Sequence, residues 1–448
     1  MKMESAEKKR ITSSVLPALK KRKTYHQKLN KPSKVNYMRD LIPEHICIHI
    51  FRFLSIEDLI RVAGVCKGFR ELIHSTPRVW RDMHLRLSCK VQKLDLEPEV
   101  VCKYAIQFAA HCQKLTINYY HCLKMADSIR NLLVNLRPIS LTSLVIIGAR
   151  RSISEVPEVS CIIEALTRML SGRKRLQKFG MTFAFWEVSD GIQVLEPVLS
   201  MSKGTLESLR IEGFFDWSGF NQKPVEFNRL TTSILLLNNL TELGLDYGFL
   251  TDAFVNALAR SNPRLKNLRL FDEVSHDSTS ILKDTWVNLT ESCPEMKVAF
   301  RIHCLTRRSP VSILGMLDPV LKVRDLRILY KEDGAFYDWS DVSDALYDIR
   351  SWYRESLVTL VLDVENTDKI DKSFLQLVRQ CEHLVYVNVS ANFHKPGTEK
   401  TVMKLIQQRR RKLNMKKTPQ TSSRCLRKHP AEGPSSNTAD TKEPINVM

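Results

Sequence analysis

The sequence predicts an α/β protein in which a small N-terminal helical module is followed by a solenoid of repeated strand–helix units. Between residues 38 and 85, apolar residues recur at three- and four-residue spacing, which is typical of amphipathic helices. From about residue 112 to 392, the pattern L-x-x-L-x-L or a close relative recurs every 25 to 35 residues or so, which indicates stacked repeats. The 448 residues are enough for one extended domain and one small domain.

The helical module has clear start signals. Pro43 suits a first helical turn, where its missing N–H is no loss, and Glu44 complements the positive end of the helix dipole. The apolar stripe that follows consists of Ile46, Ile50, Phe51 and Leu54. Ser55 is placed to cap a second helix. We expect that helix to bury a face made of Leu59, Val62, Ala63 and Cys66.

From Leu41 to Trp80 the chain resembles the F-box family. The shared spacing is Leu-x-Pro-Glu-x-Ile, Ile-Phe-x-x-Leu, Asp-Leu, Val-Cys, a large aromatic residue and a final Trp. The chain departs from the commonest pattern at Ile42 and Phe69, which keep apolar bulk. The resemblance implies a substrate-recognition adaptor of an SCF-type ubiquitin ligase, which binds a Skp-type linker protein and through it a cullin scaffold and a RING subunit. It assigns the linker interface to Leu41, Pro43, Ile46, Ile50, Leu54, Leu59, Val62, Val65, Cys66, Phe69 and Trp80.

Physical size supports a partner for this module. About forty residues in three short helices stabilise themselves poorly and gain from an external apolar surface. The alternative is that the apolar residues only close a small helical domain of the protein's own.

In the repeats, alternate leucines are expected to point into a continuous core while the residues between them line an exposed parallel sheet. The pattern resembles leucine-rich repeats of the helical kind, in which a Cys or Asn ends the helix before the strand. Asn262, Cys293 and Cys381 occupy that place here. An ordinary α/β domain is the alternative. The predicted organisation is a disordered basic arm at 1–36, the F-box at 38–85, a helical linker at 86–111, the repeat domain at 112–400, a last basic helix at 401–414 and a disordered tail at 415–448.

Aromatic residues gather just after several predicted strands, for example at 183–186 and 213–220. Repeat geometry would bring them to one edge of the sheet, and exposed aromatic residues often dominate protein interfaces. The hypothesis is that this edge binds the target through Phe185, Trp186, Phe214, Phe215 and Trp217. The alternative is that these rings pack inside the repeat loops.

The net charge of +19 is concentrated at the two ends of the chain. Residues 1–36 carry +9 and residues 402–448 carry +8, which leaves +2 for the body. The clusters KKR at 8–10 and KKRK at 20–23 resemble a bipartite nuclear import signal, although a solvated basic arm has the same composition. A nucleic-acid-binding domain would carry a basic face of its own, so nucleic acid is expected only at the tails. A nuclear scaffold acting through those tails is the alternative function.

Other functional classes leave no signal. No apolar run reaches the ~18 residues of a membrane span, and eleven irregularly placed cysteines indicate reduced thiols in the cytosol or nucleus. His111-Cys112 and His121-Cys122, with Cys102 nearby, lack the paired spacing of structural zinc. Phosphate-loop, dinucleotide-binding, H-E-x-x-H and G-x-S-x-G motifs are absent from the sequence. We therefore expect a non-catalytic protein without cofactor or metal.

Overall fold

The protein is described by a computed structural model. The chain divides into residues 1–44 and a compact unit of residues 45–448, and the helices and strands lie in the second unit apart from Glu44. The predicted disordered segments 1–36 and 415–448 lie outside the described residues. The residues that the structure describes are 42–87, 96–120, 123–136, 141–149, 159–171, 175–216, 224–274, 280–304, 310–330, 340–364 and 366–412.

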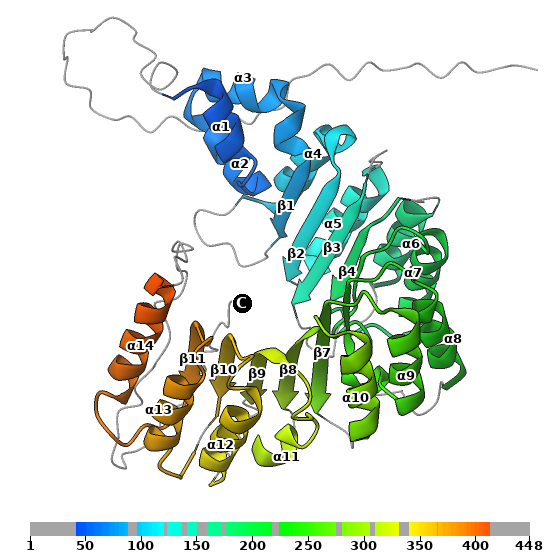
Figure 1. Cartoon of the computed structure of the whole chain (residues 1–448). Coiled ribbons are helices and arrows are strands. Elements are labelled where there is room, and N and C mark those ends of the chain that lie inside the picture. The colour runs from blue at the N-terminus through cyan, green and yellow to red at the C-terminus, as the bar shows by residue number, and fades with distance from the viewer. Residues whose placement is uncertain are drawn as a thin grey trace, which may run out of the picture. The chain divides into compact units, whose positions relative to one another are not determined.

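Short helices come first, and a long parallel sheet follows (Figure 1). The N-terminal helices are α1 (Glu44–Phe51), α2 (Ile56–Val65), α3 (Lys67–Ser75) and the 3-10 turn η1 (Pro77–Trp80). The strands are β1 (Asp82–Leu87), β2 (Lys114–Tyr120), β3 (Ser143–Ala149), β4 (Lys178–Thr182), β5 (Ser208–Arg210), β6 (Glu242–Asp246), β7 (Asn267–Val274), β8 (Lys297–Cys304), β9 (Val323–Tyr330), β10 (Thr359–Asp363) and β11 (Tyr386–Ser390).

Helices connect successive strands, a last helix follows β11, and these helices lie along one face of the sheet (Figure 1). They are α4 (Pro98–Gln107), α5 (Leu123–Asn135), α6 (Val159–Leu170), α7 (Val188–Met201), α8 (Pro224–Leu235), α9 (Asp252–Ser261), α10 (Lys283–Ser292), α11 (Pro310–Leu314), α12 (Val342–Tyr353), α13 (Asp371–Gln380) and α14 (Thr398–Lys412). Two more 3-10 turns are η2 (Ala109–His111) and η4 (Tyr247–Phe249). No helix among the described residues is long and apolar enough to cross a membrane.

The strands follow one another in the sheet in chain order, from β1 to β11, and each pairs in parallel with its neighbours. Corresponding apolar positions face one another across strands, so that Leu243 is opposite Leu268, which is opposite Val298. These side chains are buried between sheet and helices. The α/β solenoid predicted from the leucine pattern is confirmed, because stacking is what buries the leucine of each unit.

Local sequence explains where the helices start and stop. The Thr251 side chain accepts a hydrogen bond from the Phe254 N–H at 3.1 Å and so caps the start of α9. At the opposite ends, α9, α10 and α13 finish at Asn262, Cys293 and Cys381, as the repeat pattern predicted. The Cys293 thiol donates to the Asn262 carbonyl at 3.4 Å, which links two neighbouring repeats.

The first repeat begins earlier than predicted. Residues 82–87, which were expected to form the end of the F-box and the start of the helical linker, form β1 and pair in register with β2 from Asp82↔Lys114 onward. The described part of the predicted linker after β1 contains the helix α4, as expected, but α4 packs against β1, α2 and α5 as part of the repeat array. The boundary at residue 112 is therefore wrong. Met83, Leu85 and Leu87 alternate with polar residues, and all three are buried, which is why this segment pairs as a strand.

Helix α14 closes the last repeat. It begins at Thr398, close to the predicted 401, and packs against α13. Its basic residues do not all remain in water, because Arg409 donates to the carbonyls of Cys381 and Leu384 at 2.8 and 3.3 Å. Arg410 donates to the Val385 carbonyl at 2.6 Å. The two arginines thus satisfy backbone acceptors at the end of α13 and just before β11.

Asp371 organises the turn that leads into α14, and its replacement is expected to lower stability in a pH-dependent way. Its buried carboxylate accepts hydrogen bonds from Thr398 Oγ1 at 2.7 Å and from the His394 and Lys395 amides at 3.0 Å each. Burial alone would raise the pKa of Asp371, but these hydrogen bonds hold the pKa below its ordinary value. Asp371→Asn is expected to lower the free energy of unfolding by about 1–3 kcal/mol at neutral pH.

The expected loss depends on pH in a defined direction. Because the folded-state pKa of Asp371 is depressed, its stabilising effect is complete above the unfolded pKa of ~3.9 and disappears as pH falls through the folded pKa. Denaturant unfolding of wild type and variant should therefore differ by a constant amount from pH 7 down to about pH 4, and the difference should shrink as pH falls further, through the folded pKa. A difference that stays unchanged below the folded pKa would contradict the assigned hydrogen bonds.

Candidate protein-binding surfaces

The N-terminal helical module is held together by side-chain caps and a small apolar interior. The Ser55 hydroxyl accepts from the Asp58 amide at 3.2 Å at the start of α2, as predicted. Cys66 plays the same part for α3, since its sulfur accepts from the Phe69 amide at 3.4 Å. The Phe51 and Phe69 rings meet edge to face with centroids 5.4 Å apart. Leu59 and Ile73 are buried in the module.

Several large apolar side chains of the module remain in solvent. Among the described residues, four of the ten exposed large hydrophobic side chains fall between residues 46 and 65. They are Ile46 at 42% exposure, Ile50 at 46%, Phe53 at 75% and Val65 at 64%. Isolated exposed apolar residues are ordinary, whereas a concentration of them in so short a segment indicates a protein-binding surface. We call these four residues the apolar patch.

Phe53 was missed by the sequence reasoning although its signal was present. It lies three residues after Ile50 and seven after Ile46, so it belongs to the same helical stripe. The sequence reasoning assigned the stripe to Leu54, which the structure shows half-buried. The spacing fits both residues, and only the end of α1 at Phe51 decides which of them faces outward.

The residues assigned to a linker interface fall into distinct groups. Pro43, Ile46, Ile50 and Val65 are exposed, and Leu54, Val62, Cys66 and Phe69 are half-buried. Leu41 lies outside the described residues. Leu59 and Trp80 are buried, so their assignment to a partner-facing surface is corrected. For these two, the alternative that they close the module's own interior agrees with the structure.

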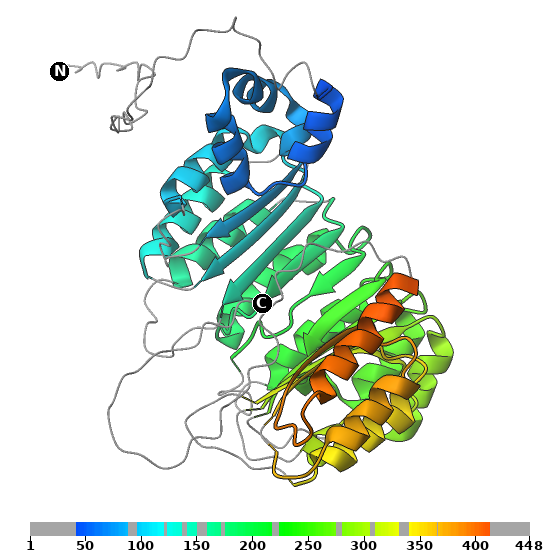
Figure 2. The same ribbon diagram turned by 90° about the vertical axis from the view of Figure 1, so that its left-hand side faces the viewer.

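Trp80 joins the helical module to the first repeat. Its ring stacks on Phe108 with centroids 3.9 Å apart and an angle of 3° between the planes. Its indole N–H donates to the Ile73 carbonyl at 2.9 Å. A second link comes from the buried Glu57 of α2, whose carboxylate accepts from the Arg86 amide of β1 at 2.7 Å. In both views the helices α1–α3 lie at the β1 end of the sheet (Figure 2).

The aromatic residues proposed for target binding are mostly inside the protein. Trp186 is buried, and Phe214 and Phe215 are both 0% exposed, so they cannot present rings to a target. This corrects the exposed-edge hypothesis for these three residues and agrees with its alternative. Trp217 lies outside the described residues. Phe185 is half-buried, so it is the one of the five whose ring is described and reaches solvent.

The loop that carries Phe185 has an unusual backbone. Phe183 and Phe185 adopt φ angles of 58° and 51°, in the left-handed region that large side chains rarely occupy. Hydrogen bonds to the next loop hold this conformation, from the Phe183 amide to the Glu212 carbonyl at 2.9 Å and from the Phe185 amide to the Gly213 carbonyl at 3.1 Å. Gly213 itself has a φ of 61°, which suits a residue without a Cβ.

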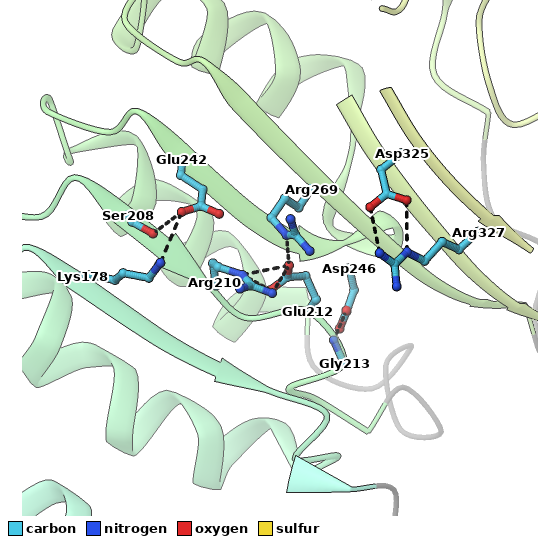
Figure 3. A network of polar contacts seen from close by, with 10 residues as sticks. All are labelled: Lys178, Ser208, Arg210, Glu212, Gly213, Glu242, Asp246, Arg269, Asp325 and Arg327. Carbon is cyan, nitrogen blue, oxygen red and sulfur yellow. Dashed lines mark hydrogen bonds and ion pairs between the residues drawn. The ribbon is translucent and has the colours of Figure 1, made fainter. Parts of the chain in front are cut away.

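A network of charged side chains covers the helix-free face of the sheet between β4 and β9 (Figure 3). The Glu212 carboxylate contacts Arg210 Nε at 3.2 Å and Arg269 Nε at 2.8 Å. On β9, Asp325 accepts two hydrogen bonds from Arg327, at 3.0 and 3.1 Å. This network was not predictable from the sequence pattern, because it depends on the register between strands that are about 30 residues apart.

The cysteines have the environment of core residues. Burial raises the pKa of both Cys102 and Cys112 to about 12, so these thiols stay protonated at neutral pH, whereas thiolate is the form that binds metal or attacks a substrate. His121 and Cys122 lie outside the described residues. Within the described part of the chain, no group of three or more His, Cys, Asp or Glu side chains is placed to hold a metal ion.

Comparison with known proteins agrees with this architecture. Residues 40–86 match the model of the F-box-like family, which covers α1 to β1. In this arrangement the chain resembles F-box proteins in which leucine-rich repeats follow the F-box. This is the family expected from the spacing between Leu41 and Trp80.

Relatives with the same two parts cover most of the chain. F-box/LRR-repeat protein 21 of Mus musculus is 22% identical over 361 residues, which are 78% of this chain and 76% of that protein. The Ovis aries protein of the same name is 21% identical over 364 residues, again 78% and 76%. Among solved structures, the leucine-rich repeat-containing protein LegL7 from Legionella pneumophila aligns with a TM-score of 0.35 and 10% identity, over 73% of this chain and 98% of that one.

Proposed function

We propose that this protein is a substrate-recognition subunit of an SCF-type ubiquitin ligase. In this proposal the F-box binds a Skp-type linker, the linker brings a cullin and its RING subunit, and the repeats hold the target. The observation that carries the proposal is the apolar patch of Ile46, Ile50, Phe53 and Val65 on a module that matches the F-box-like family. Such a patch gains free energy when a partner removes it from water.

The chain itself performs no chemistry in this proposal. Its contribution is to hold a target near the ubiquitin-charged enzyme that the RING subunit recruits, which raises the effective concentration of the reacting groups. The buried, protonated thiols of Cys102 and Cys112 are unsuited to carry ubiquitin. We place the complex in the cytosol or nucleus as part of the same proposal.

The test is binding of purified full-length protein to a Skp-type linker. Ile46→Asp combined with Ile50→Asp puts two charges into the apolar patch and is expected to weaken linker binding by about 100-fold or more, because buried apolar contacts dominate such interfaces. Isothermal titration calorimetry measures the loss. The matched control is Val225→Asp with Leu282→Asp, since both of these side chains are also exposed but lie in the repeats, on α8 and just before α10.

Wild type and control are expected to bind the linker equally well. Both double variants should keep the circular dichroism spectrum of the wild type, because all four positions are exposed. Linker binding that survives the change at Ile46 and Ile50 would overturn the proposal.

A further inference from the structure

The helix-free face of the sheet carries four arginines on neighbouring strands. Side chains alternate between the two faces of a strand, so the residues next to the buried leucines point away from the helices. The register places Arg210 of β5 opposite Gly244, and Gly244 opposite Arg269 of β7. On the adjoining strands, Arg301 of β8 is directly opposite Arg327 of β9. We call Arg210, Arg269, Arg301 and Arg327 the arginine face.

The acidic partners lie beneath the guanidinium groups. The Glu212 side chain is 5% exposed, whereas those of Arg269 and Arg327 are 37% and 41% exposed. Gly244 makes this layering feasible, because a Cβ there would lie 2.6 Å from the Glu212 carboxyl carbon. The glycine leaves room for the carboxylate to lie low between Arg210 and Arg269. At Glu212, a ligand that approaches from solvent therefore meets the positive charges of Arg210 and Arg269 first.

Arg301 packs against rings on this face of the sheet. Its guanidinium carbon is 4.7 Å from the centre of the Phe183 ring, and its Nε is 3.0 Å from His303 Nε2. Burial and the like charges of Arg327 and Arg269 together lower the pKa of Arg301 to about 10, although Glu212 and Asp325 act in the opposite direction. An additional anion at this point would relieve that repulsion.

We propose that the arginine face binds an acidic segment of the target protein, whose Asp and Glu carboxylates pair with Arg269, Arg301 and Arg327. Guanidinium groups bind carboxylates with two parallel hydrogen bonds, which supplies orientation as well as affinity. The inference rests on the proposed function, because the target is what such an adaptor would recruit. It assigns target recognition to charged residues on the sheet instead of the aromatic loops.

A nucleic acid fits this face less well than a peptide. A phosphate backbone that crossed the strands would also pass the carboxylates of Asp325 and Glu242, which are 24% and 22% exposed. The rings on this face, Phe183 and Phe271, are buried against each other and cannot stack on bases. The separate Asp and Glu side chains of a peptide can reach the arginines without lying against Asp325 and Glu242.

The experiment uses the full-length protein bound to its linker and a fluorescently labelled peptide in which glutamate alternates with serine. Fluorescence anisotropy at physiological ionic strength measures binding. Arg269→Gln combined with Arg327→Gln is expected to weaken peptide binding by about tenfold, since two charge-assisted contacts at half-exposed sites are lost. The matched control is Arg168→Gln with Arg229→Gln, two exposed arginines on the helices that also pair with glutamates. It removes the same charge and leaves the basic tails unchanged.

The outcomes separate this inference from the proposed function. Support requires that the arginine-face variant loses peptide affinity while the control and linker binding are unchanged. Equal losses in both variants would mean that the peptide responds only to net charge, and would overturn the inference. Tighter binding of a single-stranded oligonucleotide, lost in the same variant, would also overturn it. Failure of linker binding in the wild type would instead count against the proposed function.

Discussion

Trp80→Ala is expected to lower the free energy of unfolding by about 3–5 kcal/mol, the usual cost of truncating a large buried aromatic side chain. Trp80 is buried and stacks on Phe108, and its indole N–H satisfies the Ile73 carbonyl. The substitution removes the ring and leaves that carbonyl without this donor. Urea unfolding followed by circular dichroism measures the effect, because the signal does not depend on the tryptophan that is removed.

Trp80→Phe is the control for this result. It keeps most of the ring but loses the hydrogen bond to Ile73, so a smaller cost of about 1–2 kcal/mol is expected. The result also distinguishes a core residue from an interface residue. If Trp80→Ala unfolds like wild type but no longer binds the linker, Trp80 faces the partner and its assignment to the interior is wrong.

Phe215→Ala is expected to destabilise the repeats by about 3–5 kcal/mol, without a selective effect on target binding. Its ring lies between Phe214, Phe227 and Phe249, with centroids 4.7, 5.9 and 5.5 Å away. Helix α7 crosses the ring so closely that a Cβ at Gly191 would lie 2.4 Å from a Phe215 ring carbon. Denaturant unfolding of the purified variant measures the loss.

Phe185→Ala is the companion variant in the same loops. The Phe185 ring is half-buried, so its removal should cost clearly less stability than that of Phe215. If Phe215→Ala were as stable as wild type, the ring would not be part of the core, and a surface role for Phe214 and Phe215 would have to be reconsidered.

The strands were predictable because the alternation of leucine and polar residues within one segment determines which side chains lie on the buried face. In LKNLRL at 265–270, Leu268 and Leu270 alternate with polar residues, and this alone places them on the buried face of β7. The F-box was predictable for a related reason, since Pro43 and Ser55 mark the starts of α1 and α2 through backbone chemistry. Both are local signals.

The first strand was missed although DMHLRL alternates like the others. An end repeat packs against something other than another repeat, and here the neighbour of β1 is α2. The usual leucine spacing before the strand is therefore not required. The F-box pattern ends at Trp80, two residues before β1. Because of this, the residues of β1 were assigned to the helical module and linker instead of the repeats.

Binding surfaces were harder to predict than helices and strands, because apolar residues of the same kind occur both in the core and on the surface. Leu59 and Val65 belong to one helix and have similar hydrophobicity, yet one is buried and the other is 64% exposed. Phe214 and Phe215 follow a strand in the way that exposed loop residues do, and only the packing of α7 shows that they are core. The arginine face needed the register of five strands, which no single segment encodes.

The contact between Glu57 and Arg86 also bears on self-association. A sheet that grows by adding parallel strands ends in unpaired amides, and such an edge can recruit a strand from another molecule. At the β1 end of the sheet, the Glu57 carboxylate accepts a hydrogen bond from the Arg86 amide. At the β11 end, Arg409 and Arg410 donate hydrogen bonds to carbonyls that precede β11. Charged side chains thus bind an amide of β1 and carbonyls just before β11, and the bound β1 amide disfavours addition of a strand from another molecule at that end of the sheet.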